Sequence, residues 1–120
     1  MIKAAVLGSP ISHSLSPVLH RAAYAHLGIA GDYQAIEVRS GELSQFLERA
    51  LADGYSGFSL TMPLKEEVLR LVTDVEPEAR KISSANTVVR RDGQWRASST
   101  DLLAFKRIFQ QLDFDSVCVI

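Results

Sequence analysis

Strand-like and helix-like segments alternate along this chain, and that alternation limits the fold more than any other feature. Apolar, strand-like runs cover residues 2–7, 33–38 and 55–60, and a helical pattern follows each of them. Repeated strand–helix units build a largely parallel sheet with helices on both faces. The sequence therefore predicts an α/β fold, a three-layer sandwich.

The helical segments carry recognisable boundaries. Ser16 and Pro17 suit the cap and first position of a helix that Gly28 ends. We expect its buried face to hold Val18, Leu19, Ala22, Ala23 and Leu27. The clearest amphipathic pattern has apolar residues at steps of three, one, three and one: Leu43, Phe46, Leu47, Ala50 and Leu51.

The second half of the chain continues with shorter elements. A helix beginning at Pro63 and a helical turn at Pro77 precede two strands, 86–91 and 94–98, which Asp92 and Gly93 join in a tight turn. A last helix covers residues 101–112, and residues 116–120 begin another strand. The apolar side of the last helix holds Phe105, Ile108, Phe109 and Leu112.

Composition narrows the class of protein. The chain has 120 residues, enough for one compact domain, and 47% of them are hydrophobic. A net charge of −1 gives no reason to expect nucleic acid or a membrane as partner. No membrane-length apolar stretch or leader pattern is present, so we expect a cytoplasmic protein. A single cysteine, Cys118, leaves no internal disulfide and no zinc-like spacing.

Two loops are predicted at the carboxyl-end edge of the sheet, where such folds bind ligands. The first loop, residues 8–16, precedes a helix N-terminus, which favours an anion, and its Ser14 and Ser16 could bind a carboxylate. The alternative is that Ser16 only caps the helix and Ser14 is a loop residue. His13 in the same loop is either a ligand or base, or a solvated histidine.

The second loop, residues 61–65, places Lys65 in the first turn of a helix, where the dipole disfavours a cation. A departure from a local rule is expected at working sites, although most lysines are surface lysines. Asn86 at a strand entry can donate to and accept from a ligand hydroxyl, or can be a turn residue. Asp101 begins the last helix and could be only its cap.

Taken together, these stretches resemble the shikimate dehydrogenases, whose motifs they match in order and spacing over nearly the whole chain. The matching segments are Gly8-Ser9-Pro10-Ile11, Ser14-Leu15-Ser16-Pro17, Ser59-Leu60-Thr61-Met62-Pro63-Leu64-Lys65, Ser84-Ala85-Asn86-Thr87 and Ser99-Thr100-Asp101. The resemblance departs at Ser59 and at Ser99, where the family usually has asparagine.

The resemblance implies reversible reduction of 3-dehydroshikimate to shikimate by NADPH, in aromatic amino acid biosynthesis. It implies that Ser14 and Ser16 bind the substrate carboxylate, and that the ring hydroxyls are bound by Ser59, Thr61, Lys65, Asn86 and Asp101. Lys65 and Asp101 would form the catalytic pair.

The resemblance also divides the chain. Residues 1–101 would be the substrate-binding domain, and residues 102–120 a linking helix and the first strand of a truncated NADP-binding Rossmann domain. NADP would then be bound by that missing domain, and the 120-residue chain alone would be inactive. A homodimer is left open as an assembly. Two alternatives remain: an NAD-dependent quinate/shikimate dehydrogenase, and a non-catalytic module that binds a small acid.

Overall fold

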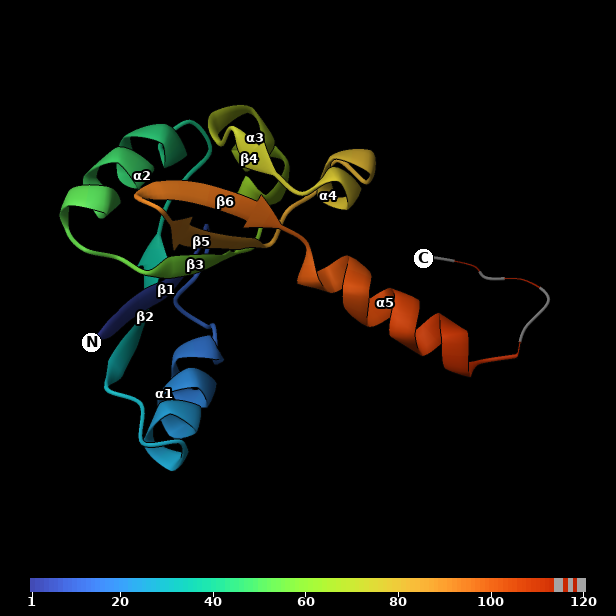
Figure 1. Ribbon diagram of the computed structural model, residues 1–120, viewed down its shortest axis with the longest axis horizontal. Coiled ribbons are helices and arrows are strands. Elements are labelled where there is room, and N and C mark those ends of the chain that lie inside the picture. The colour runs from blue at the N-terminus through green and yellow to red at the C-terminus, as the bar shows by residue number, and fades with distance from the viewer. Residues whose placement is uncertain (114–115, 117, 119–120) are drawn as a thin grey trace.

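The computed structural model describes residues 1–113, 116 and 118, and its centre is a six-stranded sheet. The strands are β1 (Ile2–Gly8), β2 (Gly31–Glu37), β3 (Gly57–Leu60), β4 (Asp74–Val75), β5 (Thr87–Arg91) and β6 (Gln94–Ser98). Their order is β2-β1-β3-β5-β6-β4 (Figure 1). β1 is parallel to β2 and β3, and β4 is parallel to β6, whereas β5 is antiparallel to both of its neighbours. The sheet is therefore mixed but mostly parallel.

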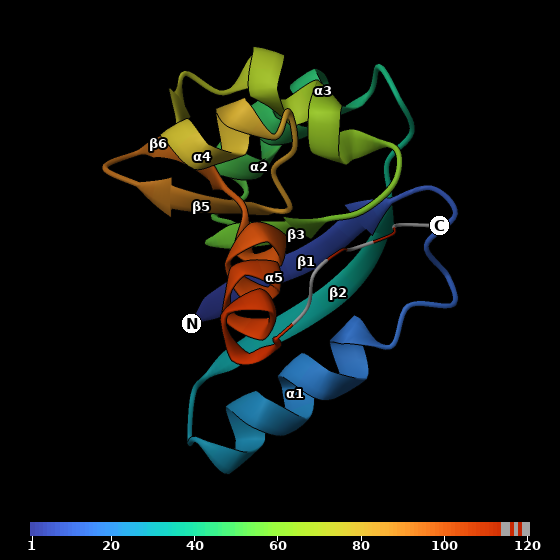
Figure 2. The same ribbon diagram turned by 90° about the vertical axis from the view of Figure 1, so that its right-hand side faces the viewer.

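Helices lie on both faces of this sheet. α1 (Ser16–His26) covers one face, whereas α2 (Leu43–Ala52), α3 (Leu64–Leu71) and α4 (Pro77–Lys81) lie on the opposite side (Figure 2). α5 (Thr100–Gln111) projects from the end of β6. The three-layer α/β sandwich predicted from the alternation of segments is thus confirmed. Within the described residues, no helix combines the length and apolar character needed to cross a membrane.

The main hydrophobic core lies between the sheet and the α2–α3 layer. Its largest fully buried side chains are Leu7, Leu43, Leu64, Val68 and Val88. The predicted 43–51 face is confirmed, because Leu43, Leu47 and Ala50 are the buried residues of α2. Trp95 joins β6 to this helix by donating its indole N–H to the Leu47 carbonyl at 3.0 Å. These buried side chains hold α2 and α3 against the sheet.

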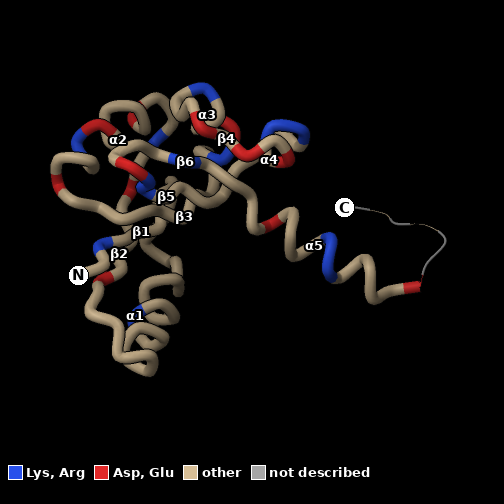
Figure 3. Tube along the Cα trace, viewed as in Figure 1, with Lys and Arg blue, Asp and Glu red and all other residues tan. Residues whose placement is uncertain are grey.

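The predicted buried face of α1 is wrong. Val18, Leu19 and Leu27 are 65%, 67% and 66% exposed, and α1 has no buried residue. The helix instead turns His20 and Tyr24 toward the sheet, where both rings pack near Tyr33. Figure 3 shows that α1 carries few charges, and the exposed Val18 and Leu19 give its outer surface an apolar stripe. Periodicity identified the apolar stripe, but it could not say that this domain leaves the stripe uncovered.

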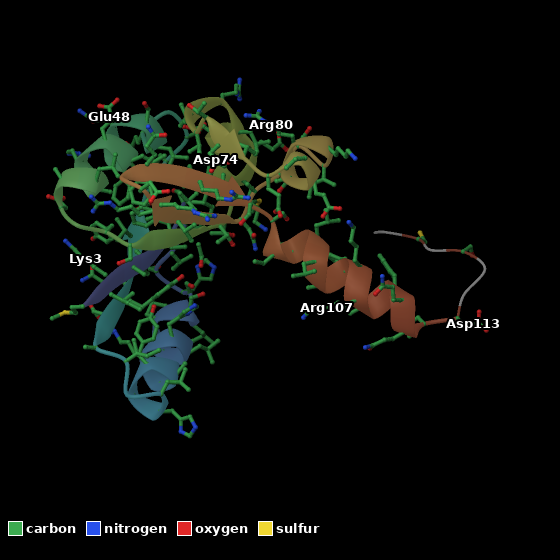
Figure 4. The ribbon with its side chains drawn as sticks, viewed as in Figure 1. Lys3, Glu48, Asp74, Arg80, Arg107 and Asp113 are labelled. Atoms are coloured by element: carbon green, nitrogen blue, oxygen red, sulfur yellow. The ribbon has the colours of Figure 1, made fainter. Side chains whose placement is uncertain are left out.

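The apolar side predicted for the last helix is also largely exposed. Phe105, Ile108 and Leu112 are 57%, 51% and 56% exposed along α5. Figure 4 shows α5 and its side chains, Arg107 among them, extending away from the sheet. An ion pair between Lys106 and Glu78 of α4 connects the helix to the domain. The strand predicted over 116–120 falls mainly outside the described residues and stays a prediction.

The turn between β5 and β6 agrees with the sequence. Asp92 and Gly93 both have positive φ, +51° and +77°, as expected for a tight turn between antiparallel strands. Pro63, by contrast, is the residue before the first turn of α3 rather than its first member. Lys65 nevertheless lies in that first turn, as predicted.

The contrast between α1 and α2 gives a stability prediction for this chain. Leu43→Ala should lower the free energy of unfolding by about 2–5 kcal/mol, because Leu43 is fully buried. The matched change on the exposed helix face, Leu19→Ala, should stay within about 0.5 kcal/mol of the parent chain. Urea unfolding of both variants measures the difference. Equal losses would show that the outer face of α1 is buried in solution.

Candidate functional site

The parallel pairing of β1 with β3 brings two predicted loops to one edge of the sheet. The loops are joined directly: the Ser9 amide donates to the Met62 carbonyl at 2.9 Å, and the Thr61 amide donates to the Leu7 carbonyl at 2.9 Å. Gly8 makes this approach possible, because a Cβ there would lie 2.4 Å from Thr61 Cγ2. The expectation that both loops lie on the carboxyl-end edge is confirmed.

A pocket of about 410 Å³ opens between these loops, and we call it the serine pocket. Its walls include Val6, His13, Ser14, Ser16 and Thr61. The N-terminus of α1 reaches the pocket through Ser16, so the positive end of the helix dipole lies beside it. Hydroxyl groups and a helix N-terminus together suit an anionic group such as a carboxylate.

The alternative that Ser16 only caps α1 is wrong. The helix starts at Ser16 itself, and the N-cap residue before it, Leu15, makes no side-chain capping hydrogen bond. The Ser14 hydroxyl accepts from the Ser16 amide at 3.3 Å, which fixes the two serines relative to each other. The Ser16 hydroxyl makes no hydrogen bond within the described residues, and it is therefore available to a ligand.

A second group of polar residues joins the starts of α3, β5 and α5, and we call it the lysine network. Lys65 Nζ donates to Asp101 Oδ2 at 2.6 Å, and the Asn86 amide donates to Asp101 Oδ1 at 2.9 Å. Thr87 and Thr100 complete the network by donating to Asn86 Oδ1 at 3.0 and 3.2 Å. Both oxygens of Asp101 are thus held by named partners, and one of those partners is the lysine.

The network remains open to solvent. The side chains of Lys65 and Asp101 are 35% and 45% exposed, so a ligand can reach both groups. Asn86 was predicted to contact a ligand hydroxyl, and the structure adds a second task for it. Because its amide donates to both Asp101 and Thr100, Asn86 orients the aspartate.

Ser99 has a structural role beside the lysine network that the sequence reasoning missed. It is the N-cap of α5, where its hydroxyl accepts from the Leu102 amide at 3.2 Å, and it is 8% exposed. Asp101 therefore does not cap the helix, so that alternative is wrong. A serine directly before a helix was the signal that could have identified the cap. By fixing the first turn of α5, Ser99 determines where Asp101 lies.

Ser59 belongs to neither group by direct contact. Its Oγ accepts from the Tyr33 hydroxyl of β2 at 2.7 Å. Tyr33 is 3% exposed, and burial raises the pKa of its phenol above the ordinary value. No local pattern predicts this contact, because the two residues are 26 positions apart and Tyr33 fitted an ordinary strand pattern.

The residues of this chain do not fit a dinucleotide. Its seven glycines, at positions 8, 28, 31, 41, 54, 57 and 93, include no Gly-x-Gly pair, so the usual turn for a pyrophosphate is absent. The polar groups at the site suit a small hydroxylated acid instead. The fold and the site together define an α/β domain with a lysine–carboxylate pair and a candidate site for a small acid.

Comparison with known proteins identifies the family. Residues 6–88 match the family model described as the shikimate dehydrogenase substrate binding domain. The chain belongs to this family and corresponds to its substrate-binding domain. It is 44% identical over 97 residues to a shikimate dehydrogenase (NADP(+)) of Xanthomonas campestris, a match that covers 81% of this chain and 34% of that protein.

Solved structures agree in fold. The shikimate 5-dehydrogenase of Thermus thermophilus in complex with NADP(H) and shikimate is 36% identical, with a TM-score of 0.85, and covers 92% of this chain and 42% of that one. A shikimate 5-dehydrogenase of Listeria monocytogenes in complex with shikimate and NAD is 31% identical, with a TM-score of 0.85, over 92% and 38%. The chain therefore spans well under half the length of these relatives.

The capping assignment gives a second stability prediction. Ser99→Ala should lower the free energy of unfolding by about 1 kcal/mol, because α5 loses its N-cap. Ser16→Ala should change it by less than about 0.5 kcal/mol, because that hydroxyl caps nothing. Thermal unfolding of the two variants checks the assignment. A larger loss at Ser16 than at Ser99 would contradict it.

Proposed function

We propose that this chain is the substrate-binding part of an NADP-dependent shikimate dehydrogenase, which reversibly reduces 3-dehydroshikimate to shikimate. The observation that carries the proposal is the Lys65–Asp101 pair, 2.6 Å apart and open to a ligand at the carboxyl-end edge of the sheet. Membership of the family supports the same function. The Thermus thermophilus relative, whose structure contains shikimate, has the same fold at 36% identity.

The substrate carboxylate belongs, in this proposal, in the serine pocket. The Ser16 hydroxyl is uncommitted, and the Ser14 hydroxyl holds the Ser16 amide, so both serines present polar atoms beside the N-terminus of α1. Thr61 lines the same pocket and would contact the part of the ring nearest the carboxylate. A net charge of −1 for the chain makes such a local site necessary, because no general positive field attracts the acid.

Lys65 and Asp101 are the proposed catalytic pair. Reduction of a ketone by hydride leaves negative charge on its oxygen, and the Lys65 ammonium donates the proton that this oxygen needs. In the reverse direction the amine takes the proton from the alcohol. Asp101 holds the ammonium by its ion pair, and Asn86 holds Asp101. Asp101, Asn86 and Ser59 would also contact ring hydroxyls.

The cofactor belongs to another part of the protein in this proposal. The Xanthomonas campestris relative is an NADP(+) enzyme, and this chain spans 34% of it. We divide the chain into a substrate-binding domain, 1–101, and a segment, 102–120, that leads into an NADP-binding domain. The exposed apolar residues of α5, Leu103, Phe105 and Ile108, support that division because they need a covering partner.

NAD in place of NADP is the second candidate, on a specific observation. The Listeria monocytogenes relative was solved with shikimate and NAD, and it is as similar in fold as the Thermus thermophilus relative. Since cofactor choice lies with residues that bind the dinucleotide, the substrate site described above is compatible with either. A quinate/shikimate dehydrogenase would use the same catalytic pair.

Calorimetry on the 120-residue chain tests the carboxylate site. Shikimate should bind weakly, and replacing both Ser14 and Ser16 by alanine should weaken that binding while leaving the methyl ester of shikimate comparatively unaffected. Ser12→Ala is the matched control, since Ser12 is exposed in the same loop and does not line the serine pocket. NADP(H) should not bind this chain. If the parent chain and the double variant bind shikimate with equal affinity, Ser14 and Ser16 do not bind the carboxylate.

Kinetics in a two-domain protein that carries this chain test Lys65. Lys65→Met should lower kcat and kcat/KM together by about 10²-fold or more, with KM nearly unchanged, because the proton is needed only in the transition state. Lys106→Met is the control, since it also removes the ammonium of an exposed ion pair. Adding Asp101→Asn to Lys65→Met should cost less than the sum of the single losses.

The opposite kinetic pattern would remove the catalytic role. If Lys65 merely attracts an anionic substrate, Lys65→Met raises KM, spares kcat, and loses its effect at high salt.

A further inference from the structure

Tyr33 reaches across the sheet in an unusual way. In the register of the strands, Tyr33 of β2 lies beside Ala4 of β1, and Ser59 of β3 lies beside Val6 of β1. Two strand spacings, about 10 Å, separate β2 from β3. The Tyr33 ring crosses β1 to bring its hydroxyl within 2.7 Å of Ser59 Oγ. The small side chain of Ala4 leaves room for this crossing, and Ala4 packs in the same cluster as Tyr33.

The direction of this hydrogen bond follows from the partners of each group. Within the described residues, Ser59 Oγ is the only hydrogen-bond partner of the Tyr33 hydroxyl. If Ser59 donated, the buried phenolic proton of Tyr33 would have no acceptor, which costs about 1–3 kcal/mol. Burial raises the pKa of the Tyr33 phenol, so the group keeps its proton at neutral pH. Tyr33 therefore donates, and the Ser59 proton is left to point elsewhere.

His20 holds the Tyr33 ring in this position. The two rings are stacked with centroids 3.9 Å apart and planes 9° apart. His20 Nδ1 lies 2.9 Å from the Ser16 carbonyl oxygen. A carbonyl only accepts, so Nδ1 carries a hydrogen and the ring is fixed at both its edge and its face. The same histidine thus ties the start of α1, with Ser16, to Tyr33.

Ser59 lies between the two halves of the candidate site. On one side its register partner is Val6, which lines the serine pocket. On the other side its register partner is Thr87, which donates to Asn86 in the lysine network. Ser59 also lines a cavity of about 240 Å³ with Tyr33 and Thr87, so a ligand placed between the serine pocket and the lysine network can reach its hydroxyl. The free proton of Ser59 is then the polar group that the middle of the ligand meets.

We propose that Tyr33, held by His20, is a positioning residue that commits Ser59 to act as a hydrogen-bond donor toward the bound acid. This inference rests on the proposed function, and it adds a specificity rule to it. The group of the ligand opposite Ser59 must offer a lone pair, as a ring hydroxyl does. A ligand that presents only an apolar group there loses one hydrogen bond and leaves the Ser59 proton unpaired.

Calorimetric titration of the 120-residue chain with shikimate tests this role. Tyr33→Phe should raise the Kd by about two- to tenfold, the scale of one neutral hydrogen bond, although the hydroxyl that it removes does not itself contact the ligand. Ser59→Ala should raise the Kd by a similar factor. The double variant should bind no more weakly than Ser59→Ala alone, because Tyr33 acts only through Ser59.

Tyr24→Phe is the matched control. Tyr24 packs edge-on against the same histidine, with ring centroids 6.3 Å apart, and its hydroxyl makes no hydrogen bond within the described residues. The Kd of the Tyr24→Phe variant for shikimate should equal that of the parent chain. A panel of shikimate analogues, each lacking one ring hydroxyl, adds a second readout. The analogue that lacks the hydroxyl opposite Ser59 should have the same Kd for the parent chain and for the Tyr33→Phe variant, because it has no group to accept the Ser59 proton.

The outcomes separate this inference from the proposed function. If the parent chain does not bind shikimate, both are overturned. If the parent binds shikimate and folded Tyr33→Phe binds it equally well, only the role of Tyr33 is overturned. Additive losses in the double variant, or a loss that persists with every analogue, would show that Tyr33 supports the fold and does not direct Ser59.

Discussion

The parallel pairing of β1 with β3 is the constraint on which the site depends. Because both strands end at the same edge, the loop that carries Ser14 and Ser16 meets the loop that carries Thr61. Two backbone hydrogen bonds between these loops, one on each side of Gly8, keep them in register. A side chain at Gly8 would separate them, so the glycine is a requirement of the site as well as of the turn.

The Lys65–Asp101 pair, which we propose to be catalytic, depends on a different part of the sheet. β5 runs antiparallel to β3, so its start, at Asn86 and Thr87, lies beside the end of β3 and the first turn of α3. β6 then returns to the same edge, and α5 delivers Asp101 there after its cap at Ser99. The mixed topology therefore brings Asn86 and Asp101 to the same edge as Lys65. An all-parallel sheet would bring the start of β5 to the opposite edge, away from Lys65.

Two helices, α1 and α5, have exposed apolar side chains that no other described element of this domain covers. α1 packs against Tyr33 through the ring of His20, and its Val18 and Leu19 side chains are exposed. α5 extends from the sheet with Phe105 and Ile108 exposed. The chain spans 34% of the length of the Xanthomonas campestris relative. In the proposed two-domain enzyme, the remaining part of the protein would supply surfaces that cover these exposed apolar side chains.

The sequence by itself determined the order and type of the described elements other than the short strand β4, which it missed. It also determined the α2 face, the Asp92–Gly93 turn and the position of Lys65 in a first helical turn. These are local properties, because periodicity, turn residues and helix boundaries act over a few neighbouring residues. Family motifs added the candidate residues at the edge of the sheet, and their assignment to ligand contacts stays a prediction.

Only the tertiary structure decided which groups meet. It placed Asn86 against Asp101, left the outer face of α1 exposed, and joined Tyr33 to Ser59 across β1. Each of these depends on strand order or on whether another element covers a surface. Such long-range contacts have no local signal, because one pattern of strands and helices is compatible with several strand orders and with several ways of covering an apolar surface.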